Sequence, residues 1–287
     1  MRHTSPSPRT WFITGASRGL GHALAVAALE RGDRVVAAAR TAAADTFDAQ
    51  HHDRVLALAL DVTDKSAVDA AVATAVDRFG RLDVVVNNAG TLSMGMVEEF
   101  TEAQARAQLE VNFFGALWVS QAVLPHLRAQ GSGHLLQVSS IAALGGFPST
   151  GLYSASKFAL EGMSEALAAE AASFGVKVTV VQPGGYWTDL YTSMASTTPA
   201  EPYAPLRAEL ERQWADGSVD SDPRLAAEAM LTLVDSDDPP LRLLLGSMVF
   251  DVAQHVTAQR LETWAAWEHV SRAAEQAVAQ PAAAPSS

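Results

Sequence analysis

Short apolar segments alternate with longer amphipathic segments along most of this chain. The short segments are continuous runs of aliphatic and β-branched residues rather than alternations of apolar and polar ones. Continuous runs of this kind are typical of strands that are buried on both faces of a sheet. The strands predicted from them cover residues 11–14, 34–39, 55–60, 82–86, 134–139, 176–182 and 241–245.

The segments between these strands carry apolar residues at helical spacing. Glycines follow three of them, at the position where helices commonly end: Gly32, Gly80 and Gly175. The helices predicted in this way cover residues 20–31, 64–79, 102–129, 152–174, 224–234 and 249–279. Because strands and helices alternate, we expect an α/β fold, a doubly wound parallel sheet of about seven strands with helices on both faces.

The chain shows no internal repeat and no linker that would divide it. We expect a flexible N-terminus over residues 1–9, a single domain over 10–279 and a flexible tail over 280–287. Residues 184–222 form a connection too long for a plain loop, and they hold several aromatic side chains. This segment is therefore predicted to be a partly helical lid over a ligand site.

Composition narrows the functional classes. The 20 basic and 32 acidic residues give a net charge of −12, which disfavours nucleic acid or an anionic membrane as a partner. The chain has no cysteine, which excludes disulfides, iron–sulfur clusters and thiolate zinc sites, and its histidines do not gather at metal spacing. It also shows neither a secretory signal nor a run of roughly 18 apolar residues. We expect a cytoplasmic protein without membrane insertion and without a metal.

The first predicted strand leads into a glycine-rich turn and then a helix, with the sequence TGASRGLG over residues 14–21. Glycines permit a tight turn and close approach of the backbone to a ligand, and the N–H groups at a helix start suit a pyrophosphate. The order strand, turn, helix predicts a Rossmann-type dinucleotide site. The residues predicted to contact the cofactor here are Gly15, Ser17, Arg18, Gly19, Leu20 and Gly21.

The same turn also matches G-x-S-x-G, the nucleophile elbow of hydrolases, over residues 15–19. Two features weigh against a nucleophile elbow. The match falls on the first strand of the chain, and a further glycine follows at Gly21, and an elbow requires neither of these. A hydrolase that uses Ser17 therefore stays a minor alternative, which would show ester cleavage dependent on Ser17.

The end of the second predicted strand indicates which dinucleotide binds. NAD sites usually carry an acidic residue there for the ribose hydroxyl, whereas NADP sites carry an arginine for the 2′-phosphate. This strand ends in alanines followed by Arg40, without an acidic residue, and Arg18 in the glycine turn could reach the same phosphate. The two arginines predict NADP, with solvated surface arginines as the alternative interpretation.

Tyr153 and Lys157 lie four residues apart in a predicted helix, and therefore on one face of it. A free phenol titrates near pH 10, and a neighbouring ammonium lowers its pKa because it stabilises the phenolate. The pair predicts a tyrosine that exchanges a proton with substrate. Such pairs also occur on exposed helix faces, so the interpretation depends on the residues around it.

Three further polar features accompany this pair. Ser140 ends the fifth predicted strand, where it could hydrogen-bond a substrate oxygen. Asn88, in the segment NNAG, ends the fourth strand, although turn chemistry alone would explain an asparagine there. Asn112 lies in an apolar stretch of a predicted helix, a position that asparagine disfavours, so a buried partner or a function is expected.

Together these features resemble the short-chain dehydrogenase/reductase family, of the standard-length type. TGASRGLG, Asp61-Val62, NNAG, Asn112, Ser140, YSASK and Pro183-Gly184 occur in the family's order and spacing. The resemblance implies that Tyr153 transfers the proton, Lys157 lowers its pKa and holds the nicotinamide ribose, Ser140 orients the carbonyl and Asn112 completes a water-mediated relay. The further cofactor contacts that it implies, with Tyr153 and Lys157, are Asp61, Val62, Asn88, Ala89, Gly90, Pro183, Gly184 and Thr188.

The function implied is an NADPH-dependent oxidoreductase that moves hydride between nicotinamide and a ketone or aldehyde, or the matching secondary alcohol. Aromatic residues in the predicted lid favour a medium-to-large apolar substrate. The candidate substrate contacts are Met94, Leu144, Phe147, Trp187 and Tyr191. By family analogy we expect a homodimer or homotetramer. A non-catalytic NADP-binding regulatory protein or redox sensor is the alternative, and the complete catalytic set argues against it.

Overall fold

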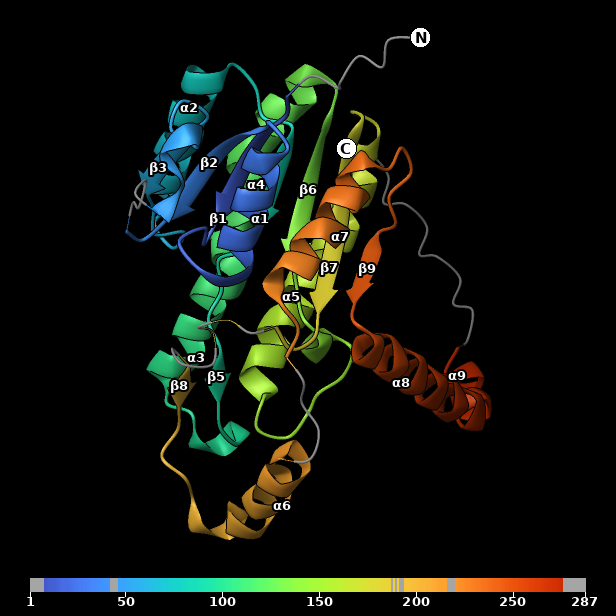
Figure 1. Ribbon diagram of the computed structural model, residues 1–287. Helices are drawn as coiled ribbons and strands as arrows, with labels where there is room; N and C mark the ends of the chain where they lie inside the picture. Colours follow the sequence, from blue (N-terminus) through green and yellow to red (C-terminus); the bar gives the residue numbers. More distant parts are fainter. Residues whose placement is uncertain are drawn as a thin grey trace, which may run out of the picture.

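A parallel sheet lies between two layers of helices in the computed structural model, which describes residues 8–41, 46–186, 188, 190, 194–215 and 220–275 (Figure 1). The strand order is β3-β2-β1-β4-β6-β7-β9, and every neighbouring pair is parallel. This confirms the predicted Rossmann-type fold class. The strands are β1 Thr10–Thr14, β2 Arg34–Ala39, β3 Val55–Ala59, β4 Val84–Asn87, β6 Gly133–Val138, β7 Val176–Pro183 and β9 Arg242–Leu245.

Helices cover both faces of this sheet and bury two separate cores. On one face, Leu24 of α1 and Met230 of α7 pack with strand residues, and on the other face Val68 of α2, Val119 of α4 and Leu167 of α5 do the same. The helices of the two layers are α1 Gly19–Glu30, α2 Lys65–Phe79, α3 Glu102–Leu109, α4 Ala116–Gln130, α5 Gly151–Ala172 and α7 Pro223–Asp235.

Burial differs between the centre of the sheet and its edges. In the central strand β1, Trp11 and Ile13 are buried beneath α1 while Phe12 is buried on the opposite face. The edge strands β3 and β9 are only partly buried. The continuous apolar pattern therefore predicts two-sided burial correctly for the centre, and overstates it at the edges, where one side of the strand has no neighbour.

The predicted helix over 102–129 is continuous but not uniformly α-helical. A π-helical segment, Glu110–Gly115, joins α3 to α4, and it contains the buried Asn112. π-Helical turns are rare and are found mostly at functional sites. The asparagine that the sequence marks as out of place thus coincides with the irregularity in the helix.

The segment after β7 is partly helical, as expected for residues 184–222. A two-residue strand β8 (Ala195–Ser196) pairs with β5 (Ser93–Met94), and α6 (Ala204–Ala215) follows a short 3₁₀ turn at Glu201–Tyr203. The described part of this segment, here called the excursion after β7 (residues 184–222), lies beyond the carboxyl ends of β6 and β7 (Figure 1). It is therefore attached to the loop after β4 rather than to the main sheet.

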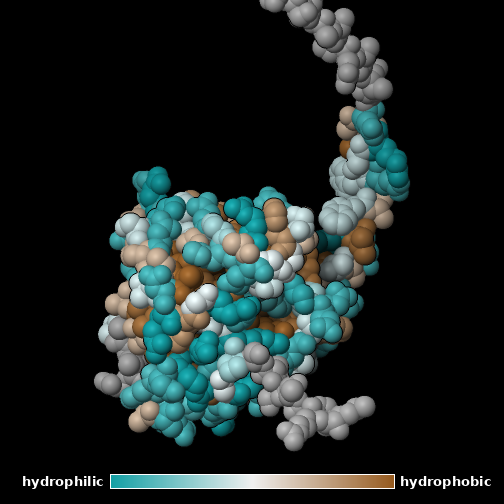
Figure 2. Space-filling model, turned by 90° about the horizontal axis from the view of Figure 1, so that it is seen from above, coloured by the Kyte–Doolittle hydropathy of each residue, from teal (hydrophilic) through white to brown (hydrophobic). Residues whose placement is uncertain are grey.

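The C-terminal part forms two helices where one was predicted over 249–279. α8 (Ser247–Ala266) ends where Trp267 leaves helical geometry at φ −104° and ψ 9°, and α9 (Glu268–Ala273) follows. Residues 257–275, here called the C-terminal arm, are all exposed. The arm projects beyond the body of the molecule in two perpendicular views (Figures 1 and 2). No helix of the described residues is both long and apolar enough to cross a membrane.

Candidate active site

The strands of the main sheet end at one edge, and ligands of open α/β sheets bind beyond such a carboxyl edge (Figure 1). The segments selected from the sequence follow these strands. They are residues 14–21 after β1, Arg40 after β2, Asp61 after β3, residues 88–90 after β4, Ser140 after β6 and Gly184 after β7. Residues far apart in the chain are thus collected at one edge.

The glycine turn is held by the end of β4. Gly15 and Gly19 have φ values of +67° and +58°, which favour glycine. A Cβ atom added to Gly21 would lie 2.4 Å from Nδ2 of Asn88 and 2.6 Å from the carbonyl oxygen of Gly15. Asn88 Nδ2 donates to the carbonyls of Thr14 and Gly15, at 2.8 and 3.2 Å. The Asn88 side chain therefore holds the glycine turn in place, and the cofactor contact that the resemblance implies for it stays a prediction.

The start of α1 fits an anionic group. Its N-cap residue, Arg18, makes no side-chain capping bond, and the first turn carries no acidic residue. Helix N-terminal N–H groups and the helix dipole attract phosphate. Ala16 N–H donates to the carbonyl of Ala38 at 3.2 Å, so the glycine turn runs beside the end of β2. Arg18 and Arg40 each follow this contact by two residues, and both are exposed.

Asp61 and Val62 lie at the end of the neighbouring edge strand. The Asp61 carboxylate accepts from the backbone N–H and the hydroxyl of Thr63, at 3.0 and 2.8 Å. Val62 is buried, and a Cβ atom added to Gly115 would lie 2.6 Å from its side chain. Gly115, at the end of the π-helical segment, therefore lets Val62 pack closely.

Tyr153 and Lys157 are both buried on the face of α5 that points to the sheet. Lys157 Nζ lies 5.8 Å from the centre of the Tyr153 ring and donates to the carbonyl of Val138 at 2.8 Å. Burial lowers the pKa of the Lys157 ammonium to about 8, and the negative charge of Glu161 opposes this shift. The pair is therefore not a surface pair, which was the open alternative.

Ser140 lies two residues after the carbonyl that Lys157 contacts. Its Oγ accepts from the N–H of Ala142 at 3.2 Å, which leaves its own O–H available as a donor. Ala142, Leu92 and Tyr153 form a small apolar cluster that Met94 and Leu190 complete. The end of β6 and the start of α5 thus meet at the same place.

Asn112 connects three elements through its side chain. Its Oδ1 accepts from Thr91 N–H at 2.8 Å, and its Nδ2 donates to the carbonyl of Thr91 and to Ser156 Oγ, both at 3.0 Å. Both N–H groups and the oxygen of this amide therefore hold the loop after β4 against α5. Its part in a proton relay stays a prediction.

The nicotinamide-side residues of the resemblance surround the end of β7. Pro183 is the last residue of β7, and Gly184 N–H donates to the carbonyl of Leu245 at 3.2 Å. A Cβ atom added to Gly19 would lie 3.2 Å from Cβ of Thr188. Thr188 therefore lies directly against the glycine turn and closes the site on that side.

The candidate substrate residues are only partly gathered. Met94 packs near Tyr153, whereas Leu144 and Phe147 lie on the loop between Ser140 and α5. Trp187 and Tyr191 lie outside the described residues. Ser149 on this loop was not anticipated: it is buried at φ +66°, and its carbonyl accepts from Gly95 N–H at 2.9 Å.

A buried carboxylate, Glu99, holds the excursion after β7, and nothing in the sequence singles it out. It accepts from Met96 N–H at 2.8 Å, from Thr197 Oγ1 at 2.7 Å, from Ala200 N–H at 2.8 Å and from the Arg207 guanidinium. The hydrogen bond from Arg207, followed by that from Ala200, lowers the pKa of Glu99 to about 2. Partners about a hundred residues away in the sequence therefore converge on one side chain.

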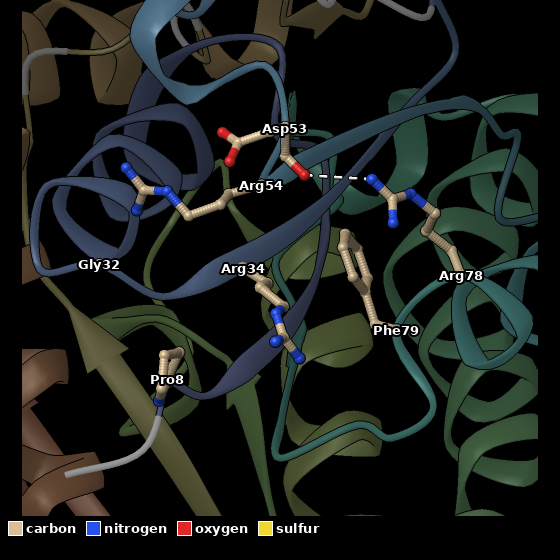
Figure 3. A pocket seen from close by; sticks show the side chains of 7 residues that line it. All are labelled: Pro8, Gly32, Arg34, Asp53, Arg54, Arg78 and Phe79. Carbon is tan, nitrogen blue, oxygen red and sulfur yellow. Dashed lines mark hydrogen bonds between the residues drawn. The ribbon is translucent and has the colours of Figure 1, made fainter.

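A hollow at the opposite end of the sheet brings together none of the predicted site residues. Arg34, Arg54, Arg78 and Phe79 line it, and Arg78 donates to the carbonyl of Asp53 at 3.1 Å (Figure 3). Within the described residues no group of three or more His, Asp or Glu side chains is arranged to hold a metal ion.

The glycine turn at the sheet edge and the buried tyrosine–lysine pair define a class: α/β oxidoreductases that bind a dinucleotide. The family model for the short-chain dehydrogenases matches residues 9–199, and the chain belongs to this family. Oxidoreductase BOA17 of Botryotinia fuckeliana is 45% identical over 246 residues, which cover 83% of this chain and 89% of that protein. The 3-ketodihydrosphingosine reductase of Bacteroides thetaiotaomicron is 36% identical over 249 residues, 84% of this chain and 89% of that protein.

Solved structures agree with this assignment. A short-chain dehydrogenase from Streptomyces avermitilis matches with a TM-score of 0.87 and 38% identity, covering 94% of this chain and 99% of that one. One from Burkholderia cenocepacia in complex with NADP matches at 0.71 and 30%, covering 90% and 96%. The 3-ketoacyl-(acyl-carrier-protein) reductase from Brucella melitensis, complexed with NADH, matches at 0.70 and 26%, covering 82% and 96%. Both nicotinamide dinucleotides thus occur among similar structures.

Proposed function

We propose that this oxidoreductase uses NADPH and transfers hydride between nicotinamide and the carbonyl carbon of a ketone or aldehyde, or of the matching secondary alcohol. The observation that carries the proposal is the buried Tyr153–Lys157 pair beside Ser140 at the carboxyl edge of the sheet. Consumption of NADPH that depends on an added ketone tests it. Turnover of esters that depends on Ser17 would instead support the hydrolase alternative.

The chain's own residues divide the chemistry between them. When bound, the nicotinamide supplies or accepts the hydride. In the reducing direction Tyr153 gives its phenolic proton to the carbonyl oxygen, and the ammonium of Lys157 stabilises the phenolate left behind. Ser140 donates its unused O–H to the same oxygen as negative charge develops there. Asn112 keeps the loop after β4 in place beside these groups.

The preference for NADPH rests on the arginines at the glycine turn and at the end of β2. Arg18 and Arg40 are exposed at the edge where an acidic residue would favour NAD, and guanidinium groups bind phosphate in a bidentate manner. We expect Arg40→Ala to weaken NADPH binding about tenfold or more and to leave NADH binding nearly unchanged. Arg34→Ala, at the other end of the same strand, is the matched control. Equal affinity of the unmodified protein for both cofactors would contradict the proposal.

The substrate class follows from the side chains around Tyr153. Leu92, Met94, Ala142 and Leu190 make this side of the site apolar. We propose that the segment after β7, which contributes Leu190, acts as a lid over it. The similarity to a 3-ketodihydrosphingosine reductase supports a long apolar ketone. We therefore propose a medium-to-large apolar carbonyl substrate, with Leu144 and Phe147, and also Trp187 and Tyr191, as contacts.

Self-association is proposed from the C-terminal arm. Leu261, Trp264, Trp267 and Val270 lie on it at roughly half to two-thirds exposure, so several large apolar side chains of the arm face solvent in the single chain. A second copy of the chain would cover these side chains in a homodimer or homotetramer. The absence of cysteine is compatible with the reducing cytoplasm, where we propose that the enzyme acts.

A further inference from the structure

The helix that carries Tyr153 and Lys157 presents a third polar residue to the sheet. Glu161 follows Lys157 by four residues, so the three side chains lie along one face of α5. All three are buried, and the Glu161 side chain is only 8% exposed. A carboxylate is rarely buried to this degree unless it is paired. Its partners therefore indicate why it is there.

Both oxygens of the Glu161 carboxylate are engaged, by residues of three different strand ends. Oε1 accepts from Ser139 Oγ at 2.6 Å, just after β6, and from Gln182 Nε2 at 2.8 Å, on β7. Oε2 pairs with Arg242 Nε at 3.3 Å, on β9. All three partners donate hydrogen bonds to the carboxylate, which explains how it can be buried. One side chain thus ties α5 to the carboxyl ends of β6 and β7 and to the first residue of β9.

Lys157 and Glu161 hold consecutive residues of the same strand end. Lys157 Nζ donates to the carbonyl of Val138, Ser139 Oγ donates to Glu161, and the next residue is Ser140. The two contacts therefore fix the position of Ser140 relative to α5, and so relative to Tyr153.

Positive and negative side chains alternate from the buried Lys157 of α5, by way of Arg242 on β9, to the exposed Glu165. The ionisable groups that face one another are Tyr153, Lys157, Glu161 and Glu165 on α5 and Arg242 on β9. Arg242 also pairs with Glu165, whose side chain is 51% exposed. Glu161 is the carboxylate whose charge acts on the buried Lys157 ammonium, and it opposes the effect of burial there.

We propose that Glu161 is a positioning residue for catalysis, which places a carboxylate one helical turn from Lys157 and fixes the Ser139–Ser140 strand end. Its role rests on the proposed reductase function, because Lys157 and Ser140 act on substrate only in that reaction. Glu161 itself contacts neither the substrate nor the cofactor. It works through Lys157 by its charge and through Ser139 by a hydrogen bond.

The direct test follows the titration of Lys157 in the cofactor-free protein. The chain has three lysines, at 65, 157 and 177, so protein labelled with ¹³C and ¹⁵N in lysine gives few side-chain signals. Loss of one signal in Lys157→Arg assigns it. In Glu161→Gln we expect the Lys157 titration to move about one pH unit lower, because a buried opposite charge has been removed.

Glu165→Gln is the matched control, since Glu165 lies one turn further along α5, shares Arg242 and is exposed. We expect it to leave the Lys157 titration in place. Arg242→Gln is a second variant that should move this titration upward, because it removes the positive charge that partly offsets Glu161. It keeps the proposal testable if Glu161→Gln does not fold. An unchanged Lys157 titration in Glu161→Gln, or an equal shift in Glu165→Gln, would overturn the proposal.

Turnover against pH separates this proposal from the proposed function. If the enzyme reduces ketones, the pH at which the rate declines on the alkaline side should be about one unit lower in Glu161→Gln than in the unmodified protein. At pH values above both declines, the variant should therefore be about tenfold slower. A Lys157 shift in a protein without any ketone-dependent turnover would refute the reductase function and leave the coupling of Glu161 to Lys157 standing. Turnover with an unshifted limb would refute the role of Glu161 and leave the reductase.

Discussion

The two sides of the site are built differently. On the cofactor and catalytic side, short contacts between neighbouring strand ends fix the groups, as where Asn88 holds the glycine turn and Asn112 holds the loop after β4. On the substrate side, a long excursion is attached through the short β5–β8 pairing and the carboxylate of Glu99. The first side depends on the main sheet itself, whereas the contacts named for the second, among the described residues, lie outside that sheet. The two sides of the site can therefore be perturbed separately by substitution.

The largest expected effect concerns the catalytic side. Tyr153→Phe removes the proton donor and keeps the ring that packs against Leu92 and Ala142. We expect turnover to fall about 10²- to 10⁴-fold while NADPH affinity stays within about twofold. Steady-state rates and cofactor fluorescence titration measure the two quantities. Retained turnover would show that the proton comes from another group.

The next effect concerns the glycine turn. Gly21→Ala would bring a methyl group within 2.6 Å of the Gly15 carbonyl, and backbone atoms cannot move aside easily. We expect a loss of about 1–3 kcal/mol in the free energy of unfolding and at least tenfold weaker cofactor binding. Gly162→Ala is the control, because nothing lies within 4 Å of a Cβ atom there, so it should be neutral or slightly stabilising. Equal behaviour of the two variants would refute the close packing of the turn.

A smaller effect is expected on the substrate side, from Glu99→Gln. The loss of charge weakens the contact with Arg207, so the excursion should open more often. We expect proteolysis within residues 194–215 to rise about tenfold, together with a higher KM for large ketones and an unchanged NADPH affinity. Glu102→Gln, on the exposed Glu102–Arg106 pair, should change neither. Unaltered proteolysis in Glu99→Gln would show that other contacts hold the lid.

The same contact predicts a response to acid. The pKa of Glu99 is lowered in the folded protein to about 2, so its contribution to stability is present above its unfolded pKa and is lost as pH falls towards 2. The protection of residues 194–215 against an acid-tolerant protease should therefore be constant between pH 7 and 5 and decline below about pH 4. In Glu99→Gln this decline should be absent. A decline of equal size in both proteins would assign the acid response to other groups.

The smallest effect on activity is expected from the C-terminal arm. Trp264→Ser removes a large exposed side chain from the arm that projects beyond the body of the molecule, so turnover per chain should change by less than about twofold (Figure 1). Sedimentation should nevertheless show weaker self-association, whereas Gln259→Ser on the same arm should not. A particle mass unchanged by Trp264→Ser would place the contact between copies elsewhere.

The comparison also explains what could be predicted from the sequence. Motifs whose residues are close together in the chain, such as the glycine turn and Tyr153–Lys157, could be predicted from the sequence. Local secondary structure alone fixes how these residues lie relative to one another. Asn112 was visible because it conflicts with its helical surroundings, although its partners Thr91 and Ser156 were not. In the sequence Glu99 and Glu161 look like ordinary acidic residues of a loop and a helix. Their donors lie far away in the chain, about a hundred residues for Ala200 to Glu99 and about eighty for Arg242 to Glu161, so only the folded structure reveals these contacts.

The most direct test of the central claim follows the hydride itself. Unmodified protein and Tyr153→Phe would each be incubated with a long-chain ketone and NADPH deuterated at C4, using both stereoisomers of the label. We predict that one isomer gives an alcohol with a single deuterium on the carbinol carbon in the unmodified protein, and that Tyr153→Phe gives at most about a hundredth of it. An alcohol without deuterium from either isomer, or no alcohol at all across ketones of increasing length, would contradict the account.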